Sequence, residues 1–299
     1  MNKIIVIVGP TGVGKTKMSV ELAKIYNGEV INADSMQIYK YLNIGTAKIK
    51  EEEKEGIVHH LFDIKELDED YSIYNYQKDC RNKIEEIKSK GKTPILVGGT
   101  GLYIKSALYD YTLSEEKVSE TYDDLSDEEL YNLLISLDKD IVIDKNNRRR
   151  LIRAINYYKE YGKSINENNN KDKLLYDNVI FIGLTTDRDV LYDKINLRVE
   201  KMIDEGLLDE VRNLYDKKIN TKPIINGIGY KEVYDYFDNL INYEEMVEKI
   251  KQNSRRYAKR QYTFFKNQMN INWFNVDYDN FDNTINEVKE FIDKEWYYV

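Results

Sequence analysis

A glycine-rich loop ending in lysine and threonine follows the first apolar run of the chain. Residues 9–16 read Gly-Pro-Thr-Gly-Val-Gly-Lys-Thr and come directly after the β-branched run of residues 4–8. This spacing matches the phosphate-binding loop G-x-x-x-x-G-K-S/T, in which main-chain N–H groups and the lysine hold phosphate oxygens. Apolar residues at helix spacing follow at Met18, Leu22 and Ile25. The segment therefore predicts a strand, an anion-binding loop and a helix.

The alternation of strand and helix patterns continues along the chain. Further apolar strand patterns occur at residues 30–33, 95–97 and 178–184. Alternating strands and helices are typical of a parallel sheet. We therefore expect an α/β fold with a parallel core of the P-loop NTPase type, formed by residues 1–112 and 169–299. Residues 113–168 are charged, contain short helix-period stretches and end in a polar linker, which predicts a helical insertion domain.

Helix-period patterns dominate after the last expected strand, and they run through residues 190–214, 232–237, 243–266 and 284–295. We expect Arg198 to lie in a helix from Leu191 to Leu207, on its apolar stripe between Ile195 and Met202. A cation in that position needs a nearby anion, unless its side chain extends from the edge of the stripe into solvent.

Composition excludes several classes of protein. The single cysteine, Cys80, rules out an internal disulfide and a cysteine-based zinc site, and its helical pattern favours a buried free thiol. The only histidines, His59 and His60, are too few for a three-ligand metal site without distant carboxylates. The chain has no run of about 18 apolar residues and no signal-peptide pattern. We therefore expect a cytoplasmic protein that does not enter a membrane.

The charge is unevenly distributed. A formal net charge of −8 argues against a polyanionic partner. The basic residues nevertheless gather in two clusters, residues 148–153 with four arginines and residues 255–266 with three arginines and two lysines. Clusters of this kind are expected of a nucleic-acid footprint, although a solvated basic face is the alternative interpretation.

A carboxylate follows the second expected strand, in the sequence Asp34-Ser35-Met36-Gln37. Open α/β sheets bind their ligands at this edge. Asp34 is therefore a candidate site residue, and its position alone is compatible with a helix N-cap, a magnesium ligand or a general base.

The third expected strand runs into Gly98-Gly99-Thr100-Gly101. The aspartate that nucleotide hydrolases use there to hold magnesium is absent from this sequence, which weakens an ATPase interpretation. Glycines permit a ligand to approach the backbone closely, and Thr100 adds a hydroxyl group. A tight strand-to-helix turn is the structural alternative.

Seven segments, taken in order, resemble the transfer RNA dimethylallyltransferase family. They are the phosphate loop, Asp-Ser-Met-Gln-Ile-Tyr-Lys at 34–40, Asn-Ile-Gly-Thr-Ala-Lys at 43–48, His-His-Leu-Phe-Asp at 59–63, Pro-Ile-Leu-Val-Gly-Gly-Thr-Gly-Leu-Tyr at 94–103, Gly-Ile-Gly-Tyr-Lys-Glu at 227–232 and Arg-Tyr-Ala-Lys-Arg-Gln at 256–261. The resemblance covers essentially the whole chain. The string around Asp34 and the Ala-Lys-Arg-Gln string are its most specific parts.

The resemblance implies transfer of a dimethylallyl group from dimethylallyl diphosphate to the exocyclic amine of the adenosine just 3′ of the anticodon. Asp34 would take the proton, Arg198 would lie near the diphosphate and Thr100 would line the channel. Magnesium would be the cofactor, with Thr16 as its protein ligand. The diphosphate would be held by Gly9, Thr11, Gly12, Gly14, Lys15 and Thr16.

The resemblance also implies a monomer that binds the anticodon stem-loop, partly through the insertion. Residues of four regions correspond to segments that meet the transfer RNA: Ser35, Met36, Gln37, Arg149, Arg150, Arg153, Gly229, Tyr230, Lys231, Arg255, Arg256, Lys259 and Arg260. Two departures are the short segment from Ser114 to Asn147 and Val58, which replaces a proline common in the family.

Three rival functions share some of these features. A small-molecule or nucleotide kinase would use the same loop but leaves the arginine clusters unexplained. An isopentenyltransferase acting on free adenine nucleotides would use the loop and Asp34 without an RNA footprint. A non-catalytic RNA-binding module would use the clusters alone.

Overall fold

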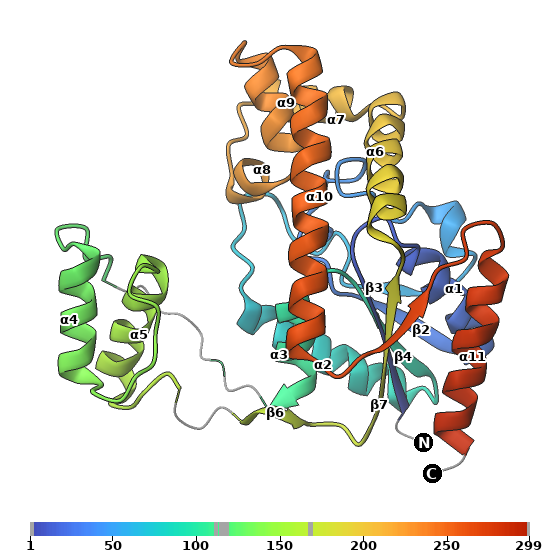
Figure 1. Ribbon diagram of the computed structural model, residues 1–299, viewed down its shortest axis with the longest axis horizontal. Coiled ribbons are helices and arrows are strands. Elements are labelled where there is room, and N and C mark those ends of the chain that lie inside the picture. The colour runs from blue at the N-terminus through green and yellow to red at the C-terminus, as the bar shows by residue number, and fades with distance from the viewer. Residues whose placement is uncertain (1–2, 111–112, 114–119, 167–169, 298–299) are drawn as a thin grey trace. The chain divides into compact units, whose positions relative to one another are not determined.

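The central feature of the fold is a six-stranded parallel sheet, shown in the computed structural model of Figure 1. The structure describes residues 3–110, 113, 120–166 and 170–297. The strands, in sheet order, are β3 (His59–His60), β2 (Gly28–Asn32), β4 (Thr93–Val97), β1 (Lys3–Val8), β7 (Asn178–Thr185) and β8 (Asn272–Asn275). The predicted α/β fold with a parallel core is therefore confirmed.

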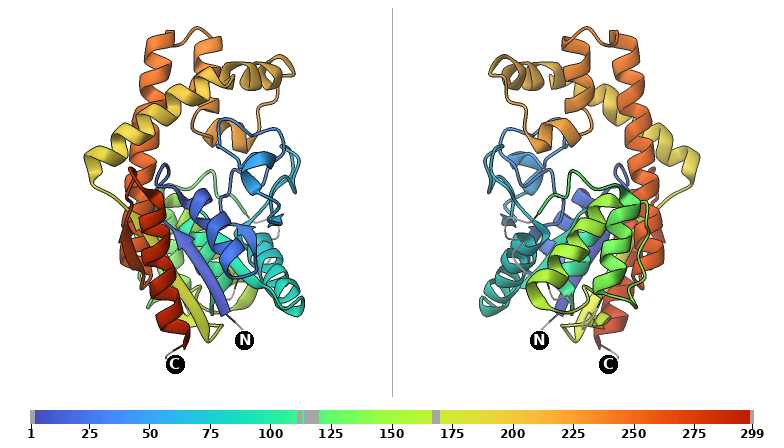
Figure 2. Two further views of the ribbon diagram at one scale, coloured as in Figure 1. Left: turned by 90° about the vertical axis from the view of Figure 1, so that its right-hand side faces the viewer. Right: turned by 90° about the vertical axis from the view of Figure 1, so that its left-hand side faces the viewer.

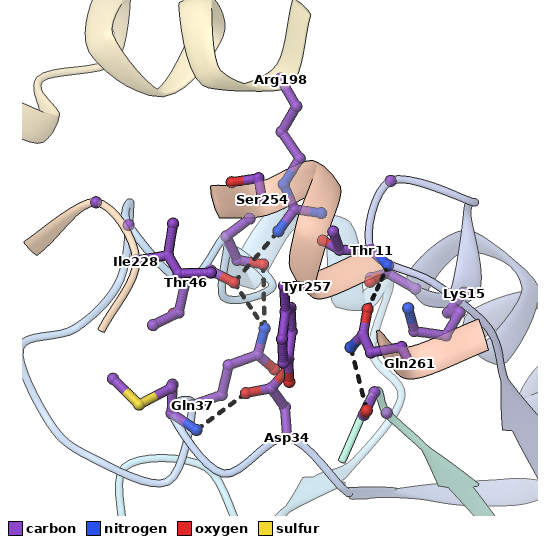
Figure 3. Close-up of a pocket in the computed structure, with 18 of the residues that line it drawn as sticks. Thr11, Lys15, Asp34, Gln37, Thr46, Arg198, Ile228, Ser254, Tyr257 and Gln261 are labelled. Carbon is purple, nitrogen blue, oxygen red and sulfur yellow. Dashed lines mark hydrogen bonds between the residues drawn. The ribbon is translucent and has the colours of Figure 1, made fainter. Parts of the chain in front are cut away.

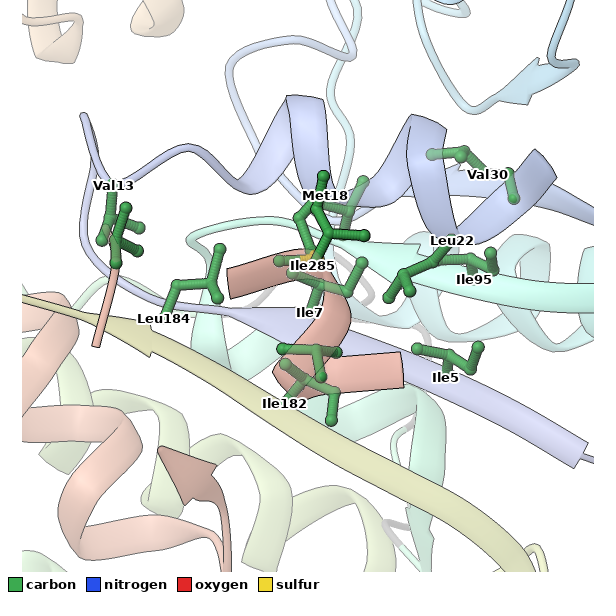
Figure 4. Packing of buried hydrophobic residues seen from close by; sticks show 14 of the residues in the cluster. Ile5, Ile7, Val13, Met18, Leu22, Val30, Ile95, Ile182, Leu184 and Ile285 are labelled. Carbon is green, nitrogen blue, oxygen red and sulfur yellow. The ribbon is translucent and has the colours of Figure 1, made fainter. Parts of the chain in front are cut away.

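Alternate residues of the strands fill the core on one face of the sheet. Ile5 of β1 lies between Ile95 of β4 and Ile180 of β7. These side chains pack with residues of α1 (Lys15–Ile25) and α11 (Phe281–Tyr297), as Figure 4 shows for Met18, Leu22 and Ile285. The strands are apolar on both faces because helices cover both sides of a parallel sheet.

The other face of the sheet is covered by α2 (Ile73–Ser89) and α3 (Gly101–Leu108), which pack against each other. The Tyr76 hydroxyl of α2 donates a hydrogen bond of 3.0 Å to the Asn32 carbonyl at the end of β2. Cys80, also in α2, is a buried free thiol, as expected. A short 3₁₀ helix, Glu51–Lys54, precedes β3.

Five helices form a second layer beyond the carboxyl ends of the strands (Figures 1 and 2). They are α6 (Arg188–Asp204), α7 (Leu207–Asp216), α8 (Lys222–Asn226), α9 (Tyr230–Phe237) and α10 (Tyr243–Gln268). A separate apolar cluster holds them together and includes Met202, Val211 and Tyr230. The 26 residues of α10 span roughly 39 Å at 1.5 Å per residue, so one helix reaches from this cluster to the sheet.

One expected helix boundary was wrong, and one strand was missed. The helix expected from Leu191 to Leu207 ends at Asp204, because Gly206 has a φ of 99°, which starts a new helix at Leu207. The strand β8 was not expected at all. It has only four residues, two of them exposed asparagines, so its pattern was too short to be recognised.

Residues Tyr109–Lys173 form the second compact unit, and Met1–Leu108 with Leu174–Val299 form the first. The second unit contains β5 (Tyr109–Asp110), α4 (Asp127–Leu137), α5 (Arg148–Tyr161) and all but the last residue of β6 (Asn170–Leu174), and the two strands pair as a small sheet. The helices bury a small core of their own that includes Leu134 and Leu151. In the described ranges no helix is both long and apolar enough to span a bilayer.

Candidate active site

A cavity of about 590 Å³ lies at the carboxyl ends of β1, β2 and β4. Its floor includes Thr11 after β1, Asp34 after β2 and Gly98 after β4, and its roof includes side chains of α6 and α10. The cavity lies within the first compact unit. Ligands of open α/β sheets bind at this edge, so the cavity is the candidate active site.

The glycine-rich loop turns tightly around one end of the cavity. Gly9, Gly12 and Gly14 all have positive φ values, of 145°, 85° and 93°. A Cβ atom on Gly14 would lie 2.7 Å from the Phe281 ring, so this position requires glycine for its conformation and for its packing. The loop leads directly into α1 at Lys15. Main-chain N–H groups at such a helix start can hold an anion.

The Lys15 ammonium group lies inside this loop. Its Nζ donates hydrogen bonds of 3.0 Å to the Gly9 carbonyl and 2.8 Å to the Pro10 carbonyl. Burial and the nearby Arg198 charge together lower the pKa of Lys15 to about 7, and the Asp34 carboxylate opposes the shift. An anion bound at the loop would stabilise the charged lysine.

Gln261 of α10 links the glycine-rich loop to the loop after β4 by two hydrogen bonds. Its Oε1 accepts a hydrogen bond of 2.9 Å from the Thr11 N–H, and its Nε2 donates one of 3.1 Å to the Gly99 carbonyl. A Cβ atom on Gly99 would lie 1.9 Å from that nitrogen. Sequence analysis did not identify this role. The sequence signal that could have revealed it is that Gln261 is a polar residue on the apolar face of its helix.

Asp34 begins a tight turn rather than a helix. Its Oδ1 accepts a hydrogen bond of 2.9 Å from the Met36 N–H, and the residues after it form bends and turns. A helix N-cap role is therefore excluded, whereas a general base or a magnesium ligand remains compatible. Thr100 lies behind this turn and accepts a hydrogen bond of 3.0 Å from the Ser35 N–H. Its hydroxyl group thus supports the turn that carries Asp34.

Gln37 and Arg198 meet at one carbonyl group. The Gln37 Nε2 donates a hydrogen bond of 3.0 Å to the Thr46 carbonyl, and the Arg198 Nη2 donates one of 3.4 Å to the same oxygen (Figure 3). Burial lowers the pKa of Arg198, and the Asp34 carboxylate opposes the shift. Arg198, the cation on the apolar stripe of α6, therefore has an anion nearby, the Asp34 carboxylate.

Tyr257 of α10 projects between the two ends of the cavity (Figure 3). Burial and the charge of Asp34 raise the pKa of its hydroxyl. The Arg260 guanidinium, also in the cavity wall, lies 5.6 Å from the Tyr257 ring centroid.

The two histidines have different surroundings. His59 lines the cavity, whereas His60 Nε2 lies 2.7 Å from Glu29 Oε2.

The other residues expected to contact RNA are either part of the cavity lining or exposed to solvent. Met36, Gly229 and Tyr230 line the cavity. Most of the basic residues are exposed: Arg149, Arg150, Arg153, Lys231, Arg256, Lys259 and Arg260.

Arg255 and Arg148, one from each basic cluster, have structural contacts. Arg255 donates to Asn196 Oδ1 at 2.6 Å and to Glu248 Oε1 at 2.8 Å, which joins α10 to α6. Arg148 pairs with Asp127 at 3.0 Å and with two carbonyl groups of the same unit. Sequence spacing alone could not separate these two from their exposed neighbours.

The fold and the cavity together define a class of protein. A parallel sheet with a G-x-x-x-x-G-K-T loop after β1 and two buried cations beside one carboxylate is a P-loop-like architecture with a built anion site. The model of the IPP transferase family matches residues 37–268. The chain belongs to this family of transferases.

Individual relatives support the same assignment. The chain is 48% identical to the tRNA dimethylallyltransferase of Anoxybacillus flavithermus, over 99% of this chain and 98% of that protein. The same identity holds for the tRNA dimethylallyltransferase of Bacillus subtilis, over 91% and 90% of the two chains.

Solved structures agree. A full-length tRNA isopentenylpyrophosphate transferase from Bacillus halodurans has a TM-score of 0.76 and 43% identity, and the match covers 99% and 97% of the chains. A eukaryotic dimethylallyltransferase acting on tRNA has a TM-score of 0.86 and 31% identity, over 96% of this chain and 77% of that one.

Proposed function

We propose that this protein transfers a dimethylallyl group from dimethylallyl diphosphate to the exocyclic amine of the adenosine just 3′ of the anticodon in tRNA. The observation that carries the proposal is a single cavity with a cationic loop at one end and a carboxylate with a fixed amide at the other. The names of the relatives, with nearly full coverage, supply the substrate class.

The cationic end suits a diphosphate leaving group. Thr11, Gly12 and Gly14 present loop backbone to the cavity, and Lys15 and Arg198 supply two buried positive charges. An allylic C–O bond breaks more easily when the charge that builds on the departing pyrophosphate is stabilised by fixed donors. These residues would therefore bind the donor substrate and lower the barrier to its cleavage.

The carboxylate end suits the acceptor base. The adenine amine would attack the allylic carbon as the carbon–oxygen bond breaks, and the proton of the amine would pass to Asp34. A base in a single-stranded loop can be turned out of its stack at low cost. Ser35, Met36 and Gln37 would contact that base.

A magnesium ion fits this arrangement in one respect. Within the described ranges no group of three or more acidic, histidine or cysteine side chains could hold a metal, but magnesium commonly binds through one or two protein ligands and substrate phosphates. Thr16, which lines the cavity after Lys15, would hold it with the diphosphate. When bound, it would supply further positive charge to the leaving group.

The exposed basic residues suit the phosphates of an anticodon stem-loop. On α5 these are Arg149, Arg150 and Arg153, and on α10 Arg256, Lys259 and Arg260. Lys231 adds a further charge beside the cavity residue Tyr230. We propose that the protein binds the RNA as a monomer through these residues, and that Arg255 contributes by keeping α10 against α6.

The proposal is tested by transfer of a radiolabelled dimethylallyl group to unmodified tRNA with magnesium. The wild type should label the RNA, and Asp34→Asn should reduce the rate by at least about 10²-fold while RNA affinity stays near the wild-type value. Asp216→Asn, at an exposed position that is not part of the cavity lining, is the matched control. Equal rates for the Asp34→Asn variant and the wild type would contradict the assignment of Asp34 as the base.

A further inference from the structure

The segment of residues 43–47 has no regular secondary structure, yet it orients two cavity side chains. The Thr46 carbonyl accepts hydrogen bonds from Gln37 and from Arg198, at 3.0 Å and 3.4 Å, and the Ala47 carbonyl lies 3.4 Å from the same Gln37 nitrogen. Because both partners of that nitrogen are carbonyl groups, the NH₂ end of the amide is fixed at this segment. Gln37 Oε1 remains the acceptor for a substrate.

Glu210 of α7 holds the segment from behind. Its carboxylate accepts hydrogen bonds from three consecutive N–H groups, those of Asn43 at 3.1 Å, Ile44 at 2.9 Å and Gly45 at 3.2 Å. Hydrogen bonds to a charged acceptor are roughly twice as strong as neutral ones. Three of them on one carboxylate fix the course of the backbone directly before Thr46.

Tyr230 completes this anchor. Its hydroxyl donates a hydrogen bond of 2.6 Å to Glu210 Oε1, and its ring lies against Gly45, where a Cβ atom would be 2.5 Å from the ring. Tyr230 also lines the cavity. Glu210 therefore connects Tyr230, in the cavity wall, with the segment whose Thr46 carbonyl accepts hydrogen bonds from Gln37 and Arg198.

We propose that Glu210 is a positioning residue for the transfer reaction. It acts through the backbone of residues 43–46 on Gln37 and on Arg198, whose side chains both donate to the Thr46 carbonyl. This inference rests on the proposed function for its kinetic consequence. Its structural consequence, a Gln37 amide held in one orientation by Glu210, is independent of any reaction.

The kinetic test is a double-mutant cycle of Glu210→Ala and Gln37→Ala. We expect Glu210→Ala to lower kcat/KM for tRNA by about 10²-fold, the effect of misplacing a contact group by about 1 Å. In the Gln37→Ala background the same substitution should cost less, because the part of the loss that runs through Gln37 is already gone while the part that runs through Arg198 stays. Asp209→Ala, which removes the exposed acid next to Glu210, is the matched control and should leave kcat/KM unchanged.

Equal losses in both backgrounds would overturn the proposal and leave Glu210 a purely structural residue. If Glu210→Ala does not fold, Glu210→Gln replaces it. The single amide oxygen still accepts from main-chain N–H groups, without the charge, whereas the NH₂ group cannot accept, so we expect a loss of about 10-fold.

A second measurement reads the amide directly. In the wild type, the two Gln37 side-chain N–H protons should give separate NMR signals with slowed solvent exchange, and Glu210→Ala should remove this protection while Asp209→Ala keeps it. An unchanged Gln37 signal in Glu210→Ala would refute the positioning role. If the wild type transferred no label to tRNA, the proposed function would fail while this test of Glu210 still stood.

Discussion

Replacing Gln261 with leucine removes the amide that joins the glycine-rich loop to the loop after β4. The native side chain satisfies the Thr11 N–H and the Gly99 carbonyl, and it is itself 5% exposed. Leucine has a similar volume but bonds to neither group, and each buried polar group left unsatisfied costs about 1–3 kcal/mol. For these two groups we expect the free energy of unfolding to fall by about 2–6 kcal/mol.

The same substitution should weaken binding of dimethylallyl diphosphate, because Thr11 loses the contact that holds the phosphate loop against α10. A loss of about 1.4 kcal/mol in binding would raise Kd tenfold. Urea unfolding and equilibrium titration with the diphosphate measure the two quantities. Thr263→Leu, at an exposed position of the same helix, is the control. If Gln261→Leu changed neither the unfolding free energy nor Kd relative to this control, the assigned role of Gln261 would be wrong.

Three further predictions follow from the charges and the backbone. The pKa of Lys15 is lowered to about 7, and a bound diphosphate raises it, so binding should take up about 0.9 proton at pH 8 and about 0.1 at pH 6. The affinity for the diphosphate should therefore fall as the pH rises through 7. Calorimetry in buffers of different ionisation enthalpy measures the proton uptake, and an uptake independent of pH would contradict the prediction. Arg149→Ala should reduce the slope of log affinity for RNA against log salt concentration by about one unit. Arg148→Ala should instead lower thermal stability, because Arg148 pairs with Asp127. The opposite pattern would reverse the two assignments. Gly14→Ala should lower the melting temperature and donor affinity together, because its φ of 93° and the Phe281 ring both exclude a side chain, and a variant with wild-type affinity would argue against a tightly packed loop.

The sequence was sufficient to predict the parallel core and the position of the phosphate loop. Both depend on local patterns: apolar β-branched runs, a fixed glycine spacing and a helix-period stretch behind the loop. The same is true of Asp34, which could be placed at the ligand-binding edge because it directly follows a strand. Its exclusion as a helix cap needed the observed turn at Met36.

The residues that the sequence did not reveal act across long separations in the chain. Gln261 reaches Thr11 over 250 positions, and Glu210 reaches Ile44 over 166 positions. A pattern in one helix carries no information about the loop that the helix will meet. For the same reason Arg255 resembled its exposed neighbours, although its partners on α6 and within α10 were decided by packing.

The helix boundary at Gly206 is a different case, because the signal was present in the sequence. An apolar pattern continues across residues 190–214, and a glycine inside a helical pattern is often tolerated. The structure uses this glycine in a left-handed conformation to end α6 and start α7. That break allows α7 to turn back and place Glu210 against residues 43–45.

The most direct test of the central claim is to identify the nucleoside that receives the label. An unmodified anticodon stem-loop with adenosine 3′ of the anticodon, the same stem-loop with guanosine there, and free AMP would be incubated with labelled dimethylallyl diphosphate and magnesium, then digested and separated. The account predicts label only in the adenosine of the first RNA. Label in AMP alone would indicate a small-acceptor enzyme, and label in none of the three would contradict prenyl transfer to RNA by this cavity.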